Sequence, residues 1–309
     1  MRRALRRVAK LCRGLLTGWL VLRLLGPEVQ PRYATPQERP LRLTGRTILV
    51  GEREMFVREA GHTTAPPLVL VHGWSLDGEA TFHRMIPRLA ARYHLIVPDH
   101  RNHGRSAWIR GPHEIGDVAE ELAGVLDGLD VSNAAVFGWS MGGMVTQELA
   151  RRRGDLVGRM ILGATAAHPI PRHRVATRVL FWVSRLLGRI SREELAKATA
   201  TVLVRTGSLE ARHRRWMREV LLRRDPTLYY EAGVAIWRFD SRGWIGALDL
   251  PAMVVVCTAD QLVPVAAQRD LARRLRTVRV VELAGARHEA VFNRADEIAE
   301  AIEGFVPSS

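Results

Sequence analysis

The pentapeptide "GWSMG", from Gly138 to Gly142, places a serine between two glycines that each stand two residues away. It lies between the apolar run "NAAVF", which predicts a strand, and the stretch from Gly142 to Arg153, which predicts a helix. A strand–turn–helix with the pattern G-x-S-x-G forms a sharp, strained turn that exposes the serine, and small residues are needed around it. The stretch therefore predicts that Ser140 is a nucleophile at the end of a sheet strand.

The sequence around this turn alternates between short apolar runs and helical stretches. The runs "RTILVG" and "EMFVREAG" predict a hairpin. The runs "PLVLVHG", "HLIVPD", "NAAVFGWS" and "GRMILGAT" predict buried strands, and helices are expected at about residues 80–92, 114–129 and 142–153. This alternation predicts an α/β fold with a doubly wound, mostly parallel sheet. Ligands of such sheets bind beyond the carboxyl ends of the strands, which is where "GWSMG" lies.

Four further stretches match motifs of a known family: "HGW" at His72–Trp74, "DHRNHGRS" at Asp99–Ser106, "CTADQLVP" with Asp260, and "GARHE" with His288. Together with "GWSMG", they make the chain resemble the α/β-hydrolase fold family over roughly residues 46–305. The resemblance implies an eight-stranded, mostly parallel sheet and a serine hydrolase of the esterase and lipase type. One position departs from the pattern, because Asn102 stands where the family commonly has glycine; asparagine tolerates left-handed backbone angles.

The resemblance also implies roles for five residues. The order Ser140, Asp260, His288 is the family's order of nucleophile, acid and base. His288 is expected to take the proton from Ser140, while Asp260 orients the imidazole and stabilises its charged form. The backbone N–H groups of Trp74 and Met141 are expected to hold the oxyanion. No cofactor is implied, and the sequence contains no His/Cys cluster with zinc spacing.

Other titratable residues near these motifs have plainer expected roles. His72 is expected to shape the oxyanion loop, and Asp99 to stabilise the turn that begins with it. Five further histidines fall into two groups, of which the first is expected to be structural and the second solvated: His100 and His103; His168, His173 and His213.

Residues 166–248 carry helical patterns and no strand pattern. The family inserts a helical cap at this position, which implies that residues 45–165 and 249–309 form the hydrolase core. A cap supplies much of a substrate pocket and excludes water. Four tryptophans in this segment suggest an apolar pocket, although some must fill the cap's own core: Trp182, Trp216, Trp237 and Trp244.

The net charge of +14 is concentrated in two segments. Residues 1–26 contribute +7 and residues 166–248 contribute +9, so the rest of the chain is close to neutral. No recognisable nucleic-acid motif accompanies either segment, so nucleic-acid binding is not expected. The basic face of the cap is interpreted as solvated, as a guide for anionic substrates, or as a contact with anionic lipid. The two cysteines, Cys12 and Cys257, do not make a disulfide framework, and Cys257 is expected to be a buried thiol.

Residues 1–26 have apolar side chains spaced three and four apart, with basic side chains on the other faces. This pattern predicts an amphipathic helix that lies on an anionic membrane surface. The apolar run is too short for a membrane span and contains Arg23. An export signal and a helix that packs on the protein itself are the alternatives. Residues 27–44 are expected to be a linker. Peripheral membrane association is the expected location, with export or the cytoplasm as alternatives.

These features together predict a serine hydrolase that cleaves carboxylic esters of apolar or lipid-like substrates through an acyl-enzyme on Ser140. The expected partner is a small-molecule or lipid ester. The same triad would also serve C–C bond hydrolysis, thioester hydrolysis or cofactor-free perhydrolysis. A ligand receptor on a retained hydrolase scaffold is the alternative from another class, and turnover at about 1–10³ per second would distinguish an enzyme from it.

Overall fold

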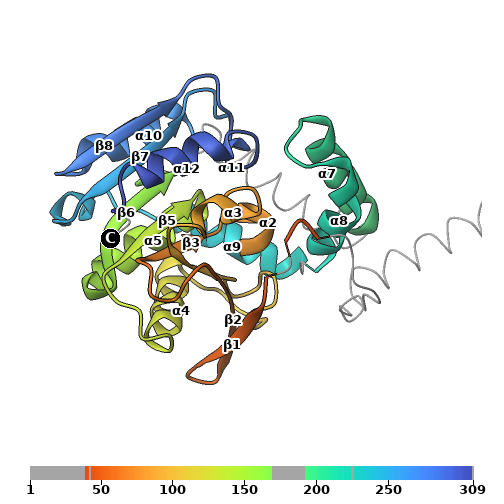
Figure 1. The fold of residues 1–309 in the computed structure, drawn as a ribbon, viewed down its shortest axis with the longest axis horizontal. Helices are drawn as coiled ribbons and strands as arrows, with labels where there is room; N and C mark the ends of the chain where they lie inside the picture. Colours follow the sequence, from red (N-terminus) through yellow and green to blue (C-terminus); the bar gives the residue numbers. More distant parts are fainter. Residues whose placement is uncertain (1–38, 42, 169–191, 224–225, 308–309) are drawn as a thin grey trace, which may run out of the picture.

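The structure is a computed structural model and describes residues 39–41, 43–168, 192–223 and 226–307. Eight strands among these residues form one sheet, in the order β1-β2-β4-β3-β5-β6-β7-β8 (Figure 1). The bounds of the first six strands follow the predicted apolar runs closely: β1 (Gly45–Val50), β2 (Arg53–Ala60), β3 (Pro67–Val71), β4 (His94–Pro98), β5 (Ala134–Trp139) and β6 (Val157–Gly163). Two further strands, β7 (Ala252–Cys257) and β8 (Val278–Leu283), complete the sheet. The predicted α/β fold is confirmed.

The sheet is antiparallel only at its β1–β2 end. β2 runs antiparallel to both β1 and β4, while the neighbouring pairs from β4 to β8 are parallel. The carboxyl ends of β3 and β5 therefore meet at the same edge of the sheet. The register pairs Val71 of β3 with Gly138 of β5, so the loop after β3 begins beside the turn that carries Ser140.

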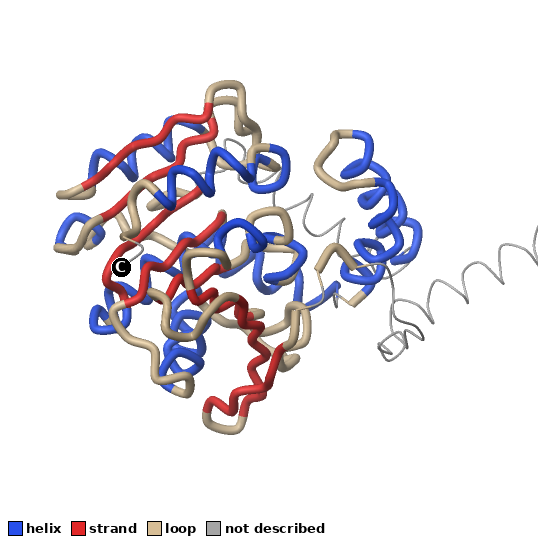
Figure 2. The backbone as a smooth tube through the Cα atoms, viewed as in Figure 1, coloured by secondary structure: helices blue, strands red, loops and turns tan. Residues whose placement is uncertain are grey.

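Two apolar layers cover the sheet, because alternate strand residues face opposite sides. Val69 and Val71 belong to one layer, and Leu68 and Leu70 belong to the other. The first layer is covered by three helices: α4 (Ile115–Asp127), α5 (Met141–Arg152) and α10 (Val265–Arg274). The second is covered by four shorter ones: α2 (Gly78–Phe82), α3 (Ile86–Leu89), α11 (Ala290–Asn293) and α12 (Ala295–Glu303). Figure 2 shows these helices on both sides of the red strands, which is the predicted doubly wound arrangement.

The single helix expected at about residues 80–92 is wrong. The structure has two short helices there, α2 and α3, with Met85 as the cap residue of the second. Pro87 explains the break, because it has no N–H to donate to the carbonyl of His83 and its ring would collide with that carbonyl. Ile86 and Leu89 of α3 are buried in the second apolar layer.

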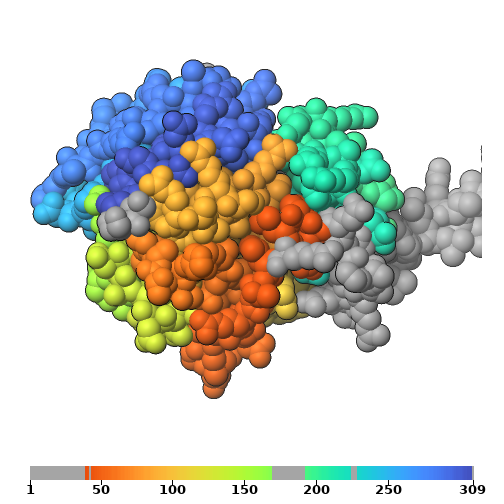
Figure 3. Space-filling model, in the orientation of Figure 1, coloured from red at the N-terminus to blue at the C-terminus, as the bar shows by residue number. Residues whose placement is uncertain are grey.

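Among the described residues between β6 and β7 are three α-helices, which we call the cap helices: α7 (Arg192–Arg205), α8 (Arg214–Leu222) and α9 (Pro226–Arg238). None of the described residues between 192 and 248 belongs to a strand. α7 and α8 pack around Ala200 and Trp216 in a cluster that also contains Ala80 of α2. Figure 3 shows the resulting contact between the α7–α8 segment, in teal, and the orange segment that contains α2 and α3.

The packing of the cap helices corrects the interpretation of two histidines. His213 is buried rather than solvated, because its ring meets that of Trp216 edge-on with centroids 6.4 Å apart. His168 is half-buried, and its Nδ1 lies 3.0 Å from the Phe239 carbonyl oxygen. Trp216 itself is 3% exposed and fills the core between α7 and α8. Its burial is therefore explained by packing within the cap.

Several predicted features lie outside the described residues: the helix of residues 1–26 with Cys12, most of the linker of residues 27–44, His173 and Trp182. Among the described helices, none combines the length and the apolar composition that a membrane crossing requires. Cys257 is buried as expected, and burial raises the pKa of its thiol to about 12.

Candidate active site

The turn between β5 and α5 has a strained backbone. Ser140 has a φ of 56° and a ψ of −117°, a conformation that residues with side chains rarely adopt. A Cβ atom on Gly138 would lie 2.4 Å from the Gly142 carbonyl oxygen, and one on Gly142 would lie 2.1 Å from that of Val71. Contact with neighbouring backbone therefore requires glycine at both positions, and the turn holds Ser140 at the carboxyl edge of the sheet.

The structure brings Ser140, His288 and Asp260 into one hydrogen-bonded chain. The Ser140 hydroxyl lies 3.0 Å from His288 Nε2, and His288 Nδ1 lies 2.8 Å from Asp260 Oδ2. Because a carboxylate only accepts, Nδ1 carries the hydrogen and Nε2 is the nitrogen that can accept the serine proton. The side chain of Asp260 is fully buried, whereas that of His288 is 19% exposed. The imidazole can therefore be reached from solvent while the acid cannot.

The carboxylate of Asp260 is held by donors from its own loop and from α10. Its Oδ1 accepts the N–H groups of Leu262 at 2.8 Å and Val263 at 3.0 Å. Its Oδ2 accepts from Gln268 Nε2 at 3.1 Å as well as from the imidazole. Gln268 is itself fixed, because its Oε1 accepts the Cys257 N–H at 3.0 Å and its Nε2 also donates to the Val263 carbonyl. The buried carboxylate is thus satisfied without the cap helices.

The two residues predicted for the oxyanion hole border the nucleophile. Met141 is the first residue of α5, so its N–H has no acceptor within the helix and lies at the positive end of the helix dipole. Trp74 follows Gly73, on which a Cβ atom would lie 3.2 Å from Ser140 Cβ and 3.8 Å from its Oγ. The backbone of the loop after β3 therefore passes directly beside Ser140.

His72 and His100 tie this loop to the loop after β4. The His100 N–H donates to His72 Nε2 at 3.0 Å, so His72 Nδ1 carries the hydrogen and donates to the Gly73 carbonyl at 2.7 Å. His100 Nε2 donates in turn to the His72 carbonyl at 3.0 Å. Burial lowers the pKa of both imidazoles well below the usual value, which keeps them neutral at pH 7. Both histidines have the structural role that the sequence predicts.

The same loop contacts the cap helix α9 on its other side. Trp74 Nε1 donates to the Tyr229 carbonyl oxygen at 2.9 Å, and the two rings stack with centroids 4.1 Å apart and planes at 11°. The Ser75 hydroxyl lies 2.9 Å from the Tyr229 hydroxyl. Sequence reasoning missed this contact, as it missed Gln268, because a tyrosine or glutamine within a helical pattern carries no signal of its partner. Only the fold brings residues 154 positions apart together.

Hydrogen bonds within and from the turn of residues 99–106 support the end of the loop after β3. Asp99 Oδ1 accepts from Arg58 at 2.7 Å and from the Gly78 N–H at 3.0 Å, and its Oδ2 accepts the Arg105 N–H at 2.9 Å. Asn102 has a φ of 63°, the left-handed conformation that its short polar side chain tolerates. Asp99 therefore stabilises the turn, as predicted, and the departure at Asn102 leaves the motif's backbone intact.

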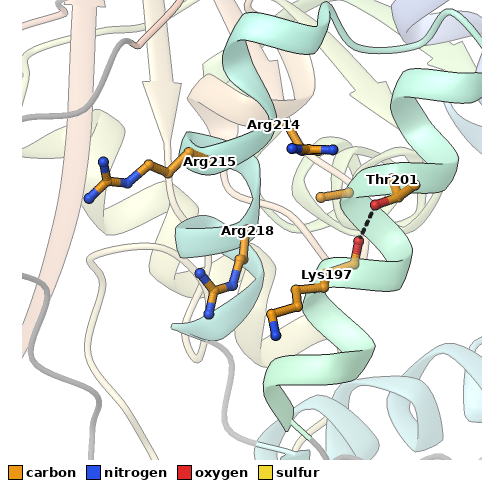
Figure 4. Close-up of a pocket in the computed structure, with 6 residues that line it drawn as sticks. Lys197, Thr201, Arg214, Arg215 and Arg218 are labelled. Carbon is orange, nitrogen blue, oxygen red and sulfur yellow. Dashed lines mark hydrogen bonds between the residues drawn. The ribbon is translucent and has the colours of Figure 1, made fainter.

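A separate pocket of about 430 Å³ lies between α7 and α8 (Figure 4). Its lining combines four basic side chains with two small residues: Lys197, Ala200, Thr201, Arg214, Arg215 and Arg218. Glu194 pairs with Lys197 at 2.7 Å, and Glu193 pairs with Arg218 at 3.3 Å. None of these lining residues belongs to the hydrogen-bonded series of Ser140, His288 and Asp260. The basic side chains of the pocket are part of the positive charge of residues 166–248.

Comparison with known proteins gives the family. The model of the alpha/beta hydrolase fold matches residues 66–295 of this chain. The chain belongs to the α/β-hydrolase fold family. This hydrolase is 30% identical over 253 residues to a pimeloyl-[acyl-carrier protein] methyl ester esterase from Aeromonas hydrophila, and the match covers 78% of this chain and 95% of the relative.

Two further similarities show how varied the relatives of this hydrolase are. It is 33% identical over 107 residues to a non-heme chloroperoxidase from Burkholderia pyrrocinia, which covers 35% of this chain and 38% of that protein. Among solved structures, it is similar to the enol-lactonase from Burkholderia xenovorans LB400, with a TM-score of 0.73, 26% identity, and coverage of 84% of this chain and 99% of that one. Together, the family and these relatives support an ester hydrolase in general.

Proposed function

We propose that this hydrolase cleaves carboxylic esters through an acyl-enzyme on Ser140. The observation that carries the proposal is the chain from Ser140 Oγ through His288 to Asp260, with contacts of 3.0 and 2.8 Å. His288 Nε2 accepts the serine proton while Oγ attacks the ester carbonyl, and the imidazolium then returns that proton to the leaving alcohol. The Asp260 carboxylate stabilises the imidazolium between the two transfers.

The second half of the reaction repeats these steps with water. His288 takes a proton from a water molecule, the hydroxide attacks the acyl carbonyl, and the proton returns to Ser140 Oγ as the acid leaves. In both halves the carbonyl oxygen becomes negative, and the N–H groups of Trp74 and Met141 are proposed to stabilise it. One such donor is worth on the order of 3 kcal/mol in the transition state.

The substrates that we propose have an apolar acyl or alcohol part, and lipid-like esters are included. Apolar side chains near the nucleophile support this choice. Trp139 is buried, with its ring centroid 6.2 Å from that of His288, and the half-buried ring of Trp74 lies in the loop beside Ser140. The basic pocket of the cap and the amphipathic pattern of residues 1–26 support a second part of the proposal, peripheral association with an anionic membrane surface.

The decisive variant is Ser140→Ala. It removes the nucleophile, so we expect hydrolysis of p-nitrophenyl esters to fall by about 10⁴-fold or more, and covalent labelling by a fluorophosphonate to disappear. Ser132→Ala, at an exposed serine of the same chain, is the matched control and should retain full activity. Serine-independent turnover in Ser140→Ala would refute the acyl-enzyme.

Acyl chains from two to sixteen carbons, assayed with the wild-type chain, test the substrate class. The proposal expects the highest kcat/KM with long chains, together with binding to anionic vesicles. A maximum at two to four carbons without vesicle binding would leave the triad in place and refute the lipid-like substrate. A methyl ester of a long-chain acid belongs in the series, because the Aeromonas relative is a methyl ester esterase.

Perhydrolysis is the second candidate, because one relative is a non-heme chloroperoxidase. In that reaction hydrogen peroxide replaces water as the nucleophile that attacks the acyl-enzyme and releases a peracid. Peracid formation from acetate and peroxide that exceeds ester hydrolysis would favour it. A chain that acylates once with each ester and then stops would instead favour a receptor on a hydrolase scaffold.

A further inference from the structure

We propose that Tyr229, in the cap helix α9, is a positioning residue for the oxyanion hole. The inference rests on the proposed function, because it takes the Trp74 N–H as one donor to the oxyanion. Tyr229 contacts two consecutive residues of the loop after β3 in three ways. Its carbonyl oxygen accepts from Trp74 Nε1 at 2.9 Å, its ring stacks on the Trp74 ring, and its hydroxyl meets the Ser75 hydroxyl at 2.9 Å.

The loop needs such support because its backbone is strained. Ser75 has a φ of 100°, in the region that favours glycine. A residue with a side chain stays in this region only where its surroundings hold it. Tyr229 bonds to this residue and covers the one before it. It therefore acts on the segment whose backbone sets the direction of the Trp74 N–H.

The opposite end of the loop is held by the core alone. His72 is fixed by the His100 N–H and by its own bond to the Gly73 carbonyl, and both imidazoles are buried. Trp74 thus lies between an anchor in the core and an anchor in the cap. Met141, the other proposed donor, is the first residue of α5, so that helix places its N–H. Loss of Tyr229 should therefore affect the Trp74 donor most directly.

This arrangement links the cap to the chemical step. The negative oxygen exists only in the transition state and the tetrahedral intermediate, so a displaced donor lowers kcat and leaves KM nearly unchanged. A residue that only shaped the substrate pocket would mainly change KM. The ratio of the two effects therefore distinguishes positioning of the oxyanion hole from binding of the substrate.

The experiment compares two variants of Tyr229 with a matched control in the full chain. Tyr229→Phe removes only the bond to Ser75, whereas Tyr229→Leu also removes the ring stack. Tyr230→Leu changes the neighbouring tyrosine of the same helix. Each protein is assayed for kcat and KM with one p-nitrophenyl ester and for inhibition by a boronic acid, which forms a tetrahedral adduct on the serine. Thermal unfolding verifies that each variant is folded.

We expect Tyr229→Leu to lower kcat by about 10- to 100-fold and to weaken the boronic acid by a similar factor, with KM within about threefold of wild type. Tyr229→Phe should lose about 3- to 10-fold in kcat, and Tyr230→Leu should lose less than about twofold. If Tyr229→Leu does not fold, Tyr229→Phe alone decides, because it keeps the ring.

A kcat within about twofold of wild type in the folded variants of Tyr229, or a loss confined to KM, would overturn the inference. An equal loss in Tyr230→Leu would overturn it as well. Ser140→Ala separates this failure from failure of the proposed function. If Ser140→Ala is inactive and Tyr229→Leu is fully active, only the positioning role is wrong; if Ser140→Ala retains turnover, the acyl-enzyme itself is wrong.

Discussion

The acid loop and the oxyanion loop border the same serine but are held by different parts of the molecule. Asp260 is fixed within residues 257–268, by two N–H groups of its own turn and by the Gln268 amide. The oxyanion loop is fixed by His72 on one side and by Tyr229, from the cap helix α9, on the other. The contacts that hold Asp260 therefore come from the core, whereas the loop after β3 is also held by the cap helix α9.

This difference predicts that the two loops contribute differently to turnover: one contributes to the hydrolysis of every ester, and the other to the choice of substrate. Because Asp260 is held by core residues, its position should not depend on the cap helices. The loop after β3 contacts the cap helix α9, so its position should depend on that helix. Variants of the acid loop should therefore reduce turnover of all esters by similar factors, and variants of the cap contact should discriminate among them.

Asp260→Asn is expected to give the largest effect on the acid side. If the amide oxygen keeps accepting the Leu262 and Val263 N–H groups, the amide NH₂ points at His288 Nδ1 and forces the hydrogen onto Nε2. The imidazole then cannot accept the serine proton. We expect kcat to fall by about 10³- to 10⁴-fold for short and long esters alike. Asp270→Asn, at a half-exposed carboxylate that pairs with Arg274 on α10, is the matched control. A loss below about tenfold would contradict the role of Asp260.

Gln268→Leu is expected to give a smaller effect on the same side. It removes one donor to the Asp260 carboxylate and leaves the buried Cys257 N–H without its acceptor. We expect kcat to fall by about 10-fold with KM unchanged, and the free energy of unfolding to fall by about 1–3 kcal/mol. Denaturant unfolding and steady-state kinetics measure the two losses.

Gln261→Leu, at an exposed glutamine of the same loop, is the control for Gln268→Leu and should change neither quantity. A Gln268→Leu enzyme that is destabilised but fully active would show that Gln268 supports the fold and not the acid. An enzyme that loses activity only with long esters would break the comparison, because the acid side would then respond to the substrate.

Features that depend on local pattern could be predicted from the sequence. The strands follow from apolar runs, and the turn at Ser140 follows from two glycines whose Cβ positions are blocked by backbone. The single helix at 80–92 failed because the apolar pattern continues through Pro87 while the hydrogen-bond ladder does not. His213 was expected in solvent because its neighbours in sequence are basic, yet Trp216, one helical turn away, buries it.

Features that depend on long-range contact could not be predicted. Ser140, Asp260 and His288 could be predicted because each lies in a motif of the family, and the family's order of these motifs along the chain indicates which residues act together. Gln268 and Tyr229 stand in ordinary helical sequence, and their partners are known only once α10 and α9 are placed. The membrane contact of residues 1–26 and the lipid-like substrate stay predictions for the same reason, since each depends on a partner outside the chain.

A further expected effect concerns the contact between core and cap at low pH. His83 lies at this contact, with Nδ1 donating to the Ala80 carbonyl and its ring 5.6 Å from that of Trp216 on α8. Burial lowers the pKa of His83 from 6.5 to about 4, helped by Arg84 and His213 and opposed by the bond to Ala80 and by Glu210. Between these values the unfolded chain binds more protons than the folded one, so stability falls as the pH drops below about 6.5.

From pH 7.5 to pH 5, His83 alone should reduce the free energy of unfolding by about 2 kcal/mol. Comparing wild type with His83→Asn at both pH values isolates this share, because other titrating groups, including the buried Asp77 and Glu79, are common to both proteins. His62→Asn, at an exposed histidine, is the control and should keep the wild-type pH dependence.

The comparison of the acid loop with the loop after β3 adds a second expectation, which concerns turnover at low pH. If protonation of His83 loosens the cap helices, the effect of Tyr229→Leu on turnover should be larger at pH 5 than at pH 7.5, while the effect of Gln268→Leu should stay constant. Equal pH dependence of both effects would show that the cap and the core respond as one unit.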